Sequence, residues 1–284
     1  MKMGALAIAL AALPALAGDP ARLLAGCGYQ PGELRVYVST GSEKHPDLAM
    51  GYVGTTSDPG GRIHTYRFLQ GELSKEGAFL ATAWVDLHTD DAGNPVAMEI
   101  VTPGADDKVE LQATIAFTKK GIVFKTDKDH ELAVPEPFRE DYERKQFAVF
   151  SATVPLMATI PIVQLGSAGE RRLSAFYCGV EGYWISYADP SVRSFEGYRV
   201  KKHEPKDVKA GGRTVRVRAF EIAPERRLKS DVSTTVAFRR PLVVAADDEG
   251  VIYGLEYGTD ASWRLERVLA LSDVREGHRE KKKE

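Results

Sequence analysis

The chain has 284 residues and a formal net charge of −2, with 43% hydrophobic and 27% charged residues. This composition is ordinary for a globular protein, and the near-neutral charge argues against a nucleic-acid binder that works through bulk electrostatics. The length allows one large β domain or two smaller ones, and no apolar run is long enough to span a bilayer, so the mature chain is expected to have no transmembrane segment.

The amino terminus has the pattern of a secretory signal peptide. Lys2 precedes an almost unbroken apolar run over residues 4–16, and Ala15-Leu16-Ala17 has the small-x-small form that signal peptidase cleaves. A buried amino-terminal helix is the structural alternative, and the lysine flank and the cleavage motif favour the signal. We therefore predict a signal peptide over residues 1–17 and export of the mature chain to the periplasm or cell envelope.

The two cysteines, Cys27 and Cys178, are candidates for a disulfide. An oxidising compartment lets such a pair persist, and two buried thiols are the alternative. Leu24-Ala25-Gly26-Cys27 also matches a bacterial lipobox, in which the cysteine is lipidated. A lipobox normally adjoins the apolar run, whereas Asp19 and Arg22 intervene here, so soluble export is favoured over a lipid anchor.

From residue 33 the chain alternates apolar and polar residues, as half-buried strands do. In the strand expected from residue 49, Gly51 and Gly54 mark a bulge or a close backbone approach. In the next strand His64, Tyr66 and Phe68 share one face. The run of antiparallel strands expected in this half comprises residues 33–39, 49–55, 62–70, 83–100 as a hairpin, 109–117 and 122–125.

Two hairpins repeat one plan, the first over residues 83–100 and the second over 242–257. Their turns are Asp90-Asp91-Ala92-Gly93 and Asp247-Asp248-Glu249-Gly250. Aspartate accommodates turns by bonding its own backbone, and glycine accepts positive φ. Structural duplication and coincidence of turn chemistry both explain the repeat, so the sequence predicts two similar halves without deciding between these origins.

A change of composition separates the halves. Residues 138–150 carry helix formers among aromatic residues and predict a short amphipathic helix, and Pro155 and Pro161 predict an extended connection after it. Strands then resume, and the charged end is expected to be disordered. The predicted organisation is an amino-terminal β half over 18–135, a joint over 136–168, a carboxy-terminal β half over 169–272 and a tail over 273–284.

Three groups of side chains are candidates for chemistry. Asp86, His88 and Asp90 share one strand face and could hold a cation, and the solvated face of a hairpin is the favoured alternative. Cys178 with His203 and Asp189 could form a thiol triad, but a strand position favours a disulfide or core role. A patch that could bind anions is formed by four basic residues, Lys201, Lys202, Arg216 and Arg218. The solvent-exposed face of a sheet explains them more simply.

Several motifs resemble those of known exported proteins. They are Gly51-Tyr-Val-Gly54, the Trp84-Val-Asp-Leu hairpin, Arg213-Thr-Val-Arg-Val and the segment from Pro241 to Glu256. The order is similar to that in uncharacterised exported bacterial β proteins, and to the non-catalytic β region that precedes the core of bacterial transglutaminase-like proteins. The catalytic core of the latter has no counterpart here. The resemblance implies an extended antiparallel sheet and a binding or scaffolding role.

The sequence therefore predicts a mainly β protein with a large curved antiparallel sheet in two similar halves and one short central helix. We predict no catalytic, cofactor-binding or metal-ligating residue and no cofactor. The favoured function is a non-enzymatic envelope protein that binds an apolar ligand or a partner protein. A secreted hydrolase with a carboxylate-based site and a purely structural module are the alternatives.

Overall fold

The computed structural model describes residues 30–41, 45–91, 93–103, 109–125, 129–145, 147–150, 157, 169–177, 195–210, 213–225, 241–247, 251–257 and 261–276. The strands are β1 (Glu33–Ser39), β2 (Asp47–Asp58), β3 (Gly61–Leu73), β4 (Phe79–Thr89), β5 (Pro95–Pro103), β6 (Val109–Thr118), β7 (Gly121–Lys125), β8 (Asp129–Leu132), β9 (Phe147–Phe150), β10 (Glu170–Tyr177), β11 (Phe195–Ala210), β12 (Arg213–Pro224), β13 (Leu242–Ala246), β14 (Ile252–Tyr257), β15 (Ala261–Ala270) and β16 (Val274–Glu276). The helical elements are α2 (Glu136–Glu143) and the 3-10 turn η2 (Leu271–Asp273).

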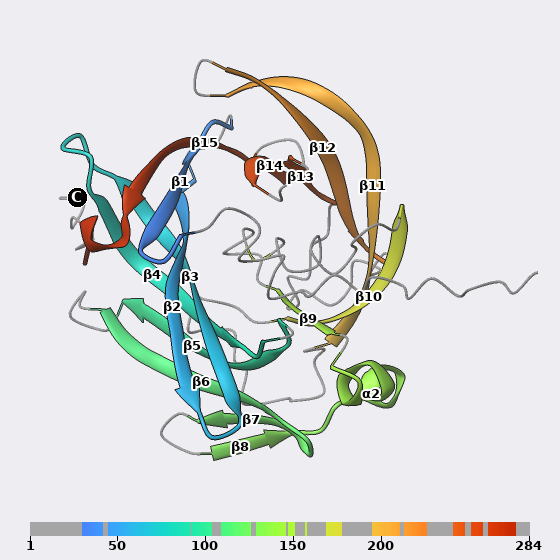
Figure 1. Ribbon diagram of the computed structural model, residues 1–284. Helices are drawn as coiled ribbons and strands as arrows, with labels where there is room; N and C mark the ends of the chain where they lie inside the picture. Colours follow the sequence, from blue (N-terminus) through green and yellow to red (C-terminus); the bar gives the residue numbers. More distant parts are fainter. Residues whose placement is uncertain are drawn as a thin grey trace, which may run out of the picture.

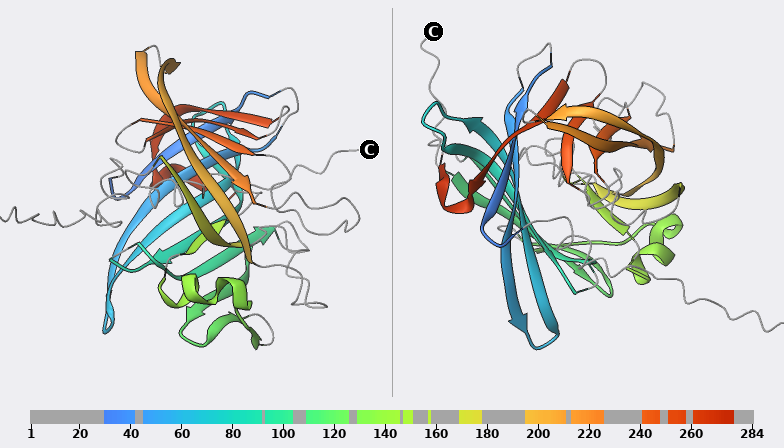
Figure 2. Two further views of the ribbon diagram at one scale, coloured as in Figure 1. Left: turned by 90° about the vertical axis from the view of Figure 1, so that its right-hand side faces the viewer. Right: turned by 45° about the horizontal axis from the view of Figure 1, so that its top comes forward.

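All of these strands belong to one 16-stranded sheet. Its order is β8-β7-β6-β5-β4-β3-β2-β1-β15-β14-β13-β12-β11-β10-β9, with β16 added beside β4. Neighbouring strands are antiparallel, except that β9 with β10 and β16 with β4 are parallel. The sheet curls strongly around its inner face (Figures 1 and 2). The prediction of a large curved antiparallel sheet with one short helix is confirmed.

Alternation of side chains builds one main core on the inner face of the sheet. Along β4 the residues Ala83, Val85 and Leu87 are buried, and they point toward the same interior as residues of the carboxy-terminal half. Leu242 and Val244 of β13 belong to the same cluster. The two predicted halves therefore share one sheet and one core.

The two ends of the sheet meet through aromatic side chains. Figure 1 shows β7 and β8 curling toward β9 and β10. The ring of Phe117 lies 5.3 Å from that of Phe147 and 5.5 Å from that of Phe176, and Phe124 lies 6.1 Å from Phe176. Among the described residues, no backbone pairing joins β8 to β9. The barrel-like shape is thus completed by apolar packing and is not closed by a continuous ladder.

Helix α2 links the two ends of the sheet. It starts with Pro137 in its first turn, where a missing N–H costs no intrahelical bond. The Tyr142 hydroxyl lies 2.8 Å from the carbonyl oxygen of Thr118 and 2.9 Å from that of Gly121, next to the β6–β7 turn. On the other side, the Ser174 hydroxyl of β10 donates to the Asp141 carboxylate. One helical turn therefore holds β6 and β7 near β10.

The predicted helix over residues 138–150 is wrong at its carboxyl end. The helix ends at Glu143, and Lys145 has a φ of 56°, a left-handed conformation that stops helices. Residues 147–150 then form β9 in parallel with β10. The apolar run Phe147-Ala-Val-Phe suits a buried strand, and Phe147 and Val149 are fully or almost fully buried.

A smaller apolar cluster lies on the other face of the sheet. It contains Leu34, Leu69 and Phe79, and it packs against Leu271 and Val274 at the end of the described chain. There β16 pairs in parallel with the start of β4, beyond the stretch of β4 that pairs with β5. The segment predicted as a disordered tail from residue 273 is therefore ordered as far as Glu276.

Several predicted features lie outside the described residues. They are the signal peptide over 1–17, both candidate disulfide cysteines (Cys27 and Cys178), and the positions of Pro155 and Pro161 in the extended connection. These stay predictions. Within the described part of the chain, no helix has the length and apolar character needed to cross a membrane.

Candidate functional site

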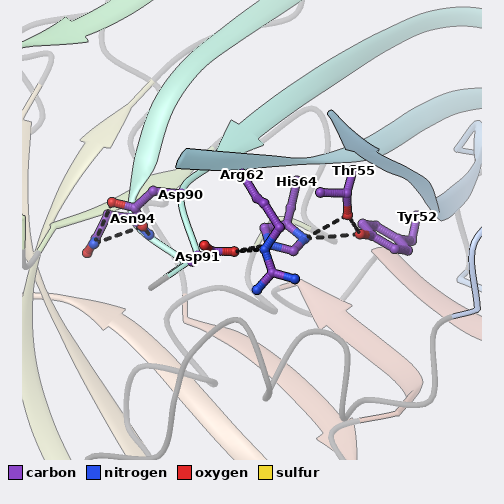
Figure 3. A network of polar contacts seen from close by, with 7 residues as sticks. All are labelled: Tyr52, Thr55, Arg62, His64, Asp90, Asp91 and Asn94. Carbon is purple, nitrogen blue, oxygen red and sulfur yellow. Dashed lines mark hydrogen bonds and ion pairs between the residues drawn. The ribbon is translucent and has the colours of Figure 1, made fainter. Parts of the chain in front are cut away.

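A network of polar side chains centres on His64 of β3. Figure 3 shows Tyr52 and Thr55 of β2 on one side of the imidazole and Asp91, from the β4–β5 turn, on the other. His64 and Tyr52 are each 8% exposed, whereas Thr55 is exposed. An exposed threonine therefore lies beside an imidazole that is shielded from solvent.

A β-bulge brings Tyr52 and Thr55 to one face. Residues three positions apart normally point to opposite faces of a strand. The pairing of β2 with β3 shifts between Tyr52 and Gly54, and Gly54 has a φ of 146°, which glycine accommodates. Thr55 then lies directly opposite His64. The predicted role of Gly54 as a bulge marker is confirmed.

Gly51 confirms the other predicted role, close backbone approach. A β carbon at Gly51 would lie 2.8 Å from the carbonyl oxygen of Glu33 on β1. Only a residue without a side chain lets β2 come this near to β1.

The hydrogen bonds order the network from hydroxyl to carboxylate. His64 Nε2 lies 3.0 Å from Asp91 Oδ1, and His64 Nδ1 lies 3.0 Å from the Tyr52 hydroxyl and 3.3 Å from Thr55 Oγ1. The Tyr52 and Thr55 hydroxyls are 2.5 Å apart. Because an ionised carboxylate only accepts, a neutral His64 donates from Nε2 to Asp91 and accepts at Nδ1 from a hydroxyl.

Asp91 is stabilised in its ionised form. The hydrogen bond from His64 is the main cause that lowers the pKa of Asp91, and the nearby guanidinium of Arg62, with Nε 2.9 Å from Oδ1, adds to it. Arg62 lies on β3 and is largely exposed. The imidazole thus has a fixed acceptor on one nitrogen and hydroxyl groups on the other.

The candidate cation site at Asp86, His88 and Asp90 is not assembled, because each side chain has another partner. Asp86 receives two hydrogen bonds from Arg67, at 2.7 and 2.6 Å, and His88 Nδ1 lies 3.0 Å from the Thr65 hydroxyl. Asp90 binds within its own turn. Among the described residues, no group of three or more metal-ligating side chains is gathered.

Asp86 is more buried than the solvated face that the sequence favoured would make it, whereas His88 and Asp90 are half-exposed. Asp86 is 6% exposed, and the Arg67 guanidinium that pairs with it lies 5.4 Å from the ring centre of Trp84. The hydrogen bond to Asp86 raises the pKa of Arg67 despite its burial. Register explains the difference, since Arg67 lies directly opposite Asp86 on β3.

Asp90 fixes the β4–β5 turn. Its Oδ1 accepts the backbone N–H of Asn94 at 2.9 Å, and its Oδ2 lies 3.0 Å from Lys145 Nζ at the end of α2. Burial alone would raise the pKa of Asp90, but the hydrogen bonds from Asn94 and Lys145 outweigh burial and lower it. Asp90 therefore holds in place the turn that carries Asp91, its neighbour in the chain and a member of the His64 network.

The remaining candidates from the sequence are not brought together in the described chain. His203 lies 3.1 Å from Glu221, and the other two members of the proposed thiol triad, Cys178 and Asp189, lie outside the described residues. In the ladder between β11 and β12, Lys201 lies opposite Glu221 and Arg216 opposite Asp207. Acidic residues thus lie opposite two of the four basic residues of the candidate anion patch, whereas Lys202 lies opposite Phe220 and Arg218 opposite Pro205.

A groove of about 230 Å³ is lined mainly by residues of β11–β15. Its floor follows a row of small residues across three strands, in which Ala219 pairs with Ala245 and Ala245 with Gly254. Arg264 stands at the end of this row, opposite Gly254. Two further lining residues, Leu255 and Trp263, also belong to the main core. The other apolar and charged side chains that line the groove are Val208, Val243, Tyr253, Lys206 and Glu256.

Sequence reasoning missed both sites. The Gly51-Tyr-Val-Gly54 motif and the Asp-Asp turn were visible, but only strand register shows that Asp91 meets His64. The groove had no signal beyond scattered small residues, because its shape depends on the register in which β12, β13 and β14 pair with one another.

Comparison with protein-family models finds no match, and comparison with curated proteins finds none either. Among solved structures, the chain is similar to a β-barrel-like protein of domain of unknown function DUF1849 from Brucella abortus, with 11% identity, a TM-score of 0.44, and coverage of 85% of this chain and 98% of that one. A candidate exported protein with a YmcC-like fold from Bacteroides fragilis gives 9% identity, a TM-score of 0.31, and coverage of 85% and 97%. A candidate lipoprotein from Parabacteroides distasonis gives 9% identity, a TM-score of 0.32, and coverage of 84% and 96%. These three are not described as transglutaminase-like proteins, so that part of the resemblance stays a prediction.

Proposed function

We propose that this is an exported, non-enzymatic protein of the cell envelope that binds a largely apolar ligand in the groove of β11–β15. The groove is the observation that carries the proposal. Val243 and Ala245 of β13 supply apolar surface there without belonging to the main core. Export rests on the amino-terminal signal pattern.

Charged side chains at the rim of the groove favour a ligand with a negatively charged group. Lys206 and Arg264 are exposed at the groove, and Glu256 is the acidic side chain that lines it. A ligand with an apolar body and an anionic end fits this arrangement, because ligand sites combine apolar walls with a few orienting polar groups.

Two probes test the groove directly. Anilinonaphthalene sulfonate has an apolar body with a sulfonate, and Nile red is apolar and uncharged. We expect both to bind the purified protein, and Ala245→Leu to weaken both at least tenfold by filling the floor. Ala97→Leu, at a half-buried alanine of β5 outside the groove, is the matched control. Equal binding by the Ala245→Leu variant would place the probes elsewhere and remove the support for the proposal.

Native mass spectrometry of protein taken gently from the producing cell envelope tests the natural ligand. Extra mass that leaves on denaturation is the expected result. Protein that carries no extra mass and binds neither probe would instead favour a partner protein or a structural role.

A further inference from the structure

The His64 network has the parts of an activated hydroxyl, and the proposed ligand groove does not use it. A hydroxyl becomes nucleophilic when a base within hydrogen-bonding reach takes its proton and a third group orients that base. Here the hydroxyl is that of Thr55, the base is His64 and the orienting group is Asp91. Thr55 Oγ1 lies 3.3 Å from His64 Nδ1, and His64 Nε2, on the other side of the ring, lies 3.0 Å from Asp91 Oδ1.

We propose that Thr55 is an acyl acceptor, modified by activated carboxylic esters with His64 as the general base. Thr55 Oγ1 would attack the ester carbonyl carbon while its proton passes to His64 Nδ1. The bond from that carbon to the leaving alcohol oxygen then breaks, and the alcohol takes the proton from Nδ1. The products are an ester on Thr55 and the free alcohol.

Burial and exposure are distributed as this reaction requires. Thr55 is an exposed residue, whereas His64 is 8% exposed, so water competes little for the Nδ1 lone pair of the imidazole. Asp91 holds the proton on Nε2 and stabilises the positive charge that forms on the ring. The Tyr52 hydroxyl, 2.5 Å from Thr55 and 3.0 Å from Nδ1, offers a second path for the same proton.

The chain offers a matched control next to the acceptor. Thr56 is also exposed, but it pairs with Ile63, and adjacent strand residues point to opposite faces. Thr56 therefore has the same chemistry and accessibility without the imidazole.

The test uses p-nitrophenyl acetate with the full purified protein, and intact mass with peptide mapping as the readout. We expect one acetyl group on Thr55, a rate lower by about 10²-fold in His64→Gln, and loss of that label in Thr55→Val. Thr56→Val should be acetylated as the parent is, and Thr55→Ser should still be acetylated at residue 55. These two variants distinguish loss of the acceptor hydroxyl from loss of the folded structure. Acetyl groups confined to lysines, or equal labelling of Thr55 in His64→Gln, would overturn the proposal.

Discussion

Asp90 and Asp247 hold the same position in two hairpins from different halves of the chain. Asp90 Oδ1 accepts the backbone N–H of Asn94 at 2.9 Å, and Asp247 Oδ1 accepts that of Val251 at 2.9 Å. The backbone N–H of each aspartate donates to the carbonyl of the same partner, at 3.0 and 3.1 Å. The repeat seen in the sequence therefore extends to the hydrogen bonds of the turns.

This equivalence predicts equivalent losses of stability. Asp90→Ala and Asp247→Ala should each lower the free energy of unfolding by about 1–2 kcal/mol, because a turn N–H loses its acceptor. Asp→Asn should restore most of this at both sites, since the amide oxygen still accepts. Urea unfolding measures the differences, with Asp207→Ala at an exposed ladder position as the control. A loss at one turn without the other would show that the two hairpins do not contribute equally to stability.

Tyr142 should contribute to stability through its hydroxyl. Tyr142→Phe keeps the ring stacked on Phe147, with centroids 4.9 Å apart, but removes the bond to Thr118 and Gly121. We expect a loss of about 1–2 kcal/mol in urea unfolding. Arg139→Gln, on the same helix and paired at the surface with Glu136, should change stability by less than about 0.5 kcal/mol.

The same residue should make the protein sensitive to alkali. Burial raises the pKa of Tyr142 to about 12, above the ordinary value near 10. The folded state then holds this proton more tightly than the unfolded state, so stability falls as the pH rises from about 10 to 12. A fall of equal slope in Tyr142→Phe would show that other groups cause it.

Gly71 should tolerate no side chain. A β carbon there would lie 2.0 Å from the carbonyl oxygen of Leu80, at the bulge between β3 and β4. Gly71→Ala should therefore cost about 3 kcal/mol by forcing backbone apart. Gly169→Ala is the matched control, because nothing lies within 4 Å of the position that its β carbon would take. We expect this variant to leave the free energy of unfolding unchanged or to raise it by up to about 0.5 kcal/mol. Similar values for the two variants would contradict the steric argument.

Asp86 and Arg67 should be strongly coupled. Removal of the carboxylate in Asp86→Ala leaves a partly buried guanidinium without its main acceptor, which we expect to cost about 2–3 kcal/mol. In a double-mutant cycle, Arg67→Ala with Asp86→Ala should cost clearly less than the sum of the single variants. Arg144→Ala, which removes an exposed pair with Glu140, should cost less than about 0.5 kcal/mol. Additive single effects would mean that the pair contributes packing alone.

The parts of the fold that depend on local chemistry could be predicted. Turn residues and alternation predicted the hairpins, and Gly54 predicted the β2 bulge, because each acts within a few residues. The end of α2 could not be predicted from helix propensity, since Phe147 pairs with Ser174, a partner far along the chain. The contact between the two ends of the sheet could not be predicted either, because Phe117 meets Phe176 only after the whole sheet has curled.

The candidate sites show the same limit more sharply. Asp86, His88 and Asp90 share a strand spacing, yet their partners differ. Strand register places Asp86 opposite Arg67 and His88 opposite Thr65, whereas Asp90 bonds to Asn94 within its own turn. Asp91 and His64 have no local signal that connects them, and they meet because β3 pairs with β4 in one particular register. The register of a bulged strand is set only when the whole sheet has assembled. The sequence therefore indicated which polar residues lie on these strands, but not which of them contact one another.

Asp91 should connect the network to acid stability. Its hydrogen bond from His64 and the charge of Arg62 keep its pKa below the ordinary value near 4. A carboxylate with a lowered pKa in the folded state stabilises that state above its unfolded pKa, and this contribution is lost as the pH falls through the folded value. We therefore expect the difference in unfolding free energy between the parent and Asp91→Asn to be present at pH 5–6 and to shrink below about pH 4. Urea unfolding at a series of pH values measures it. A difference that is independent of pH would mean that the Asp91 carboxylate is not coupled to His64 and Arg62 in the folded protein, and that the orientation of the imidazole depends on Tyr52 and Thr55 alone.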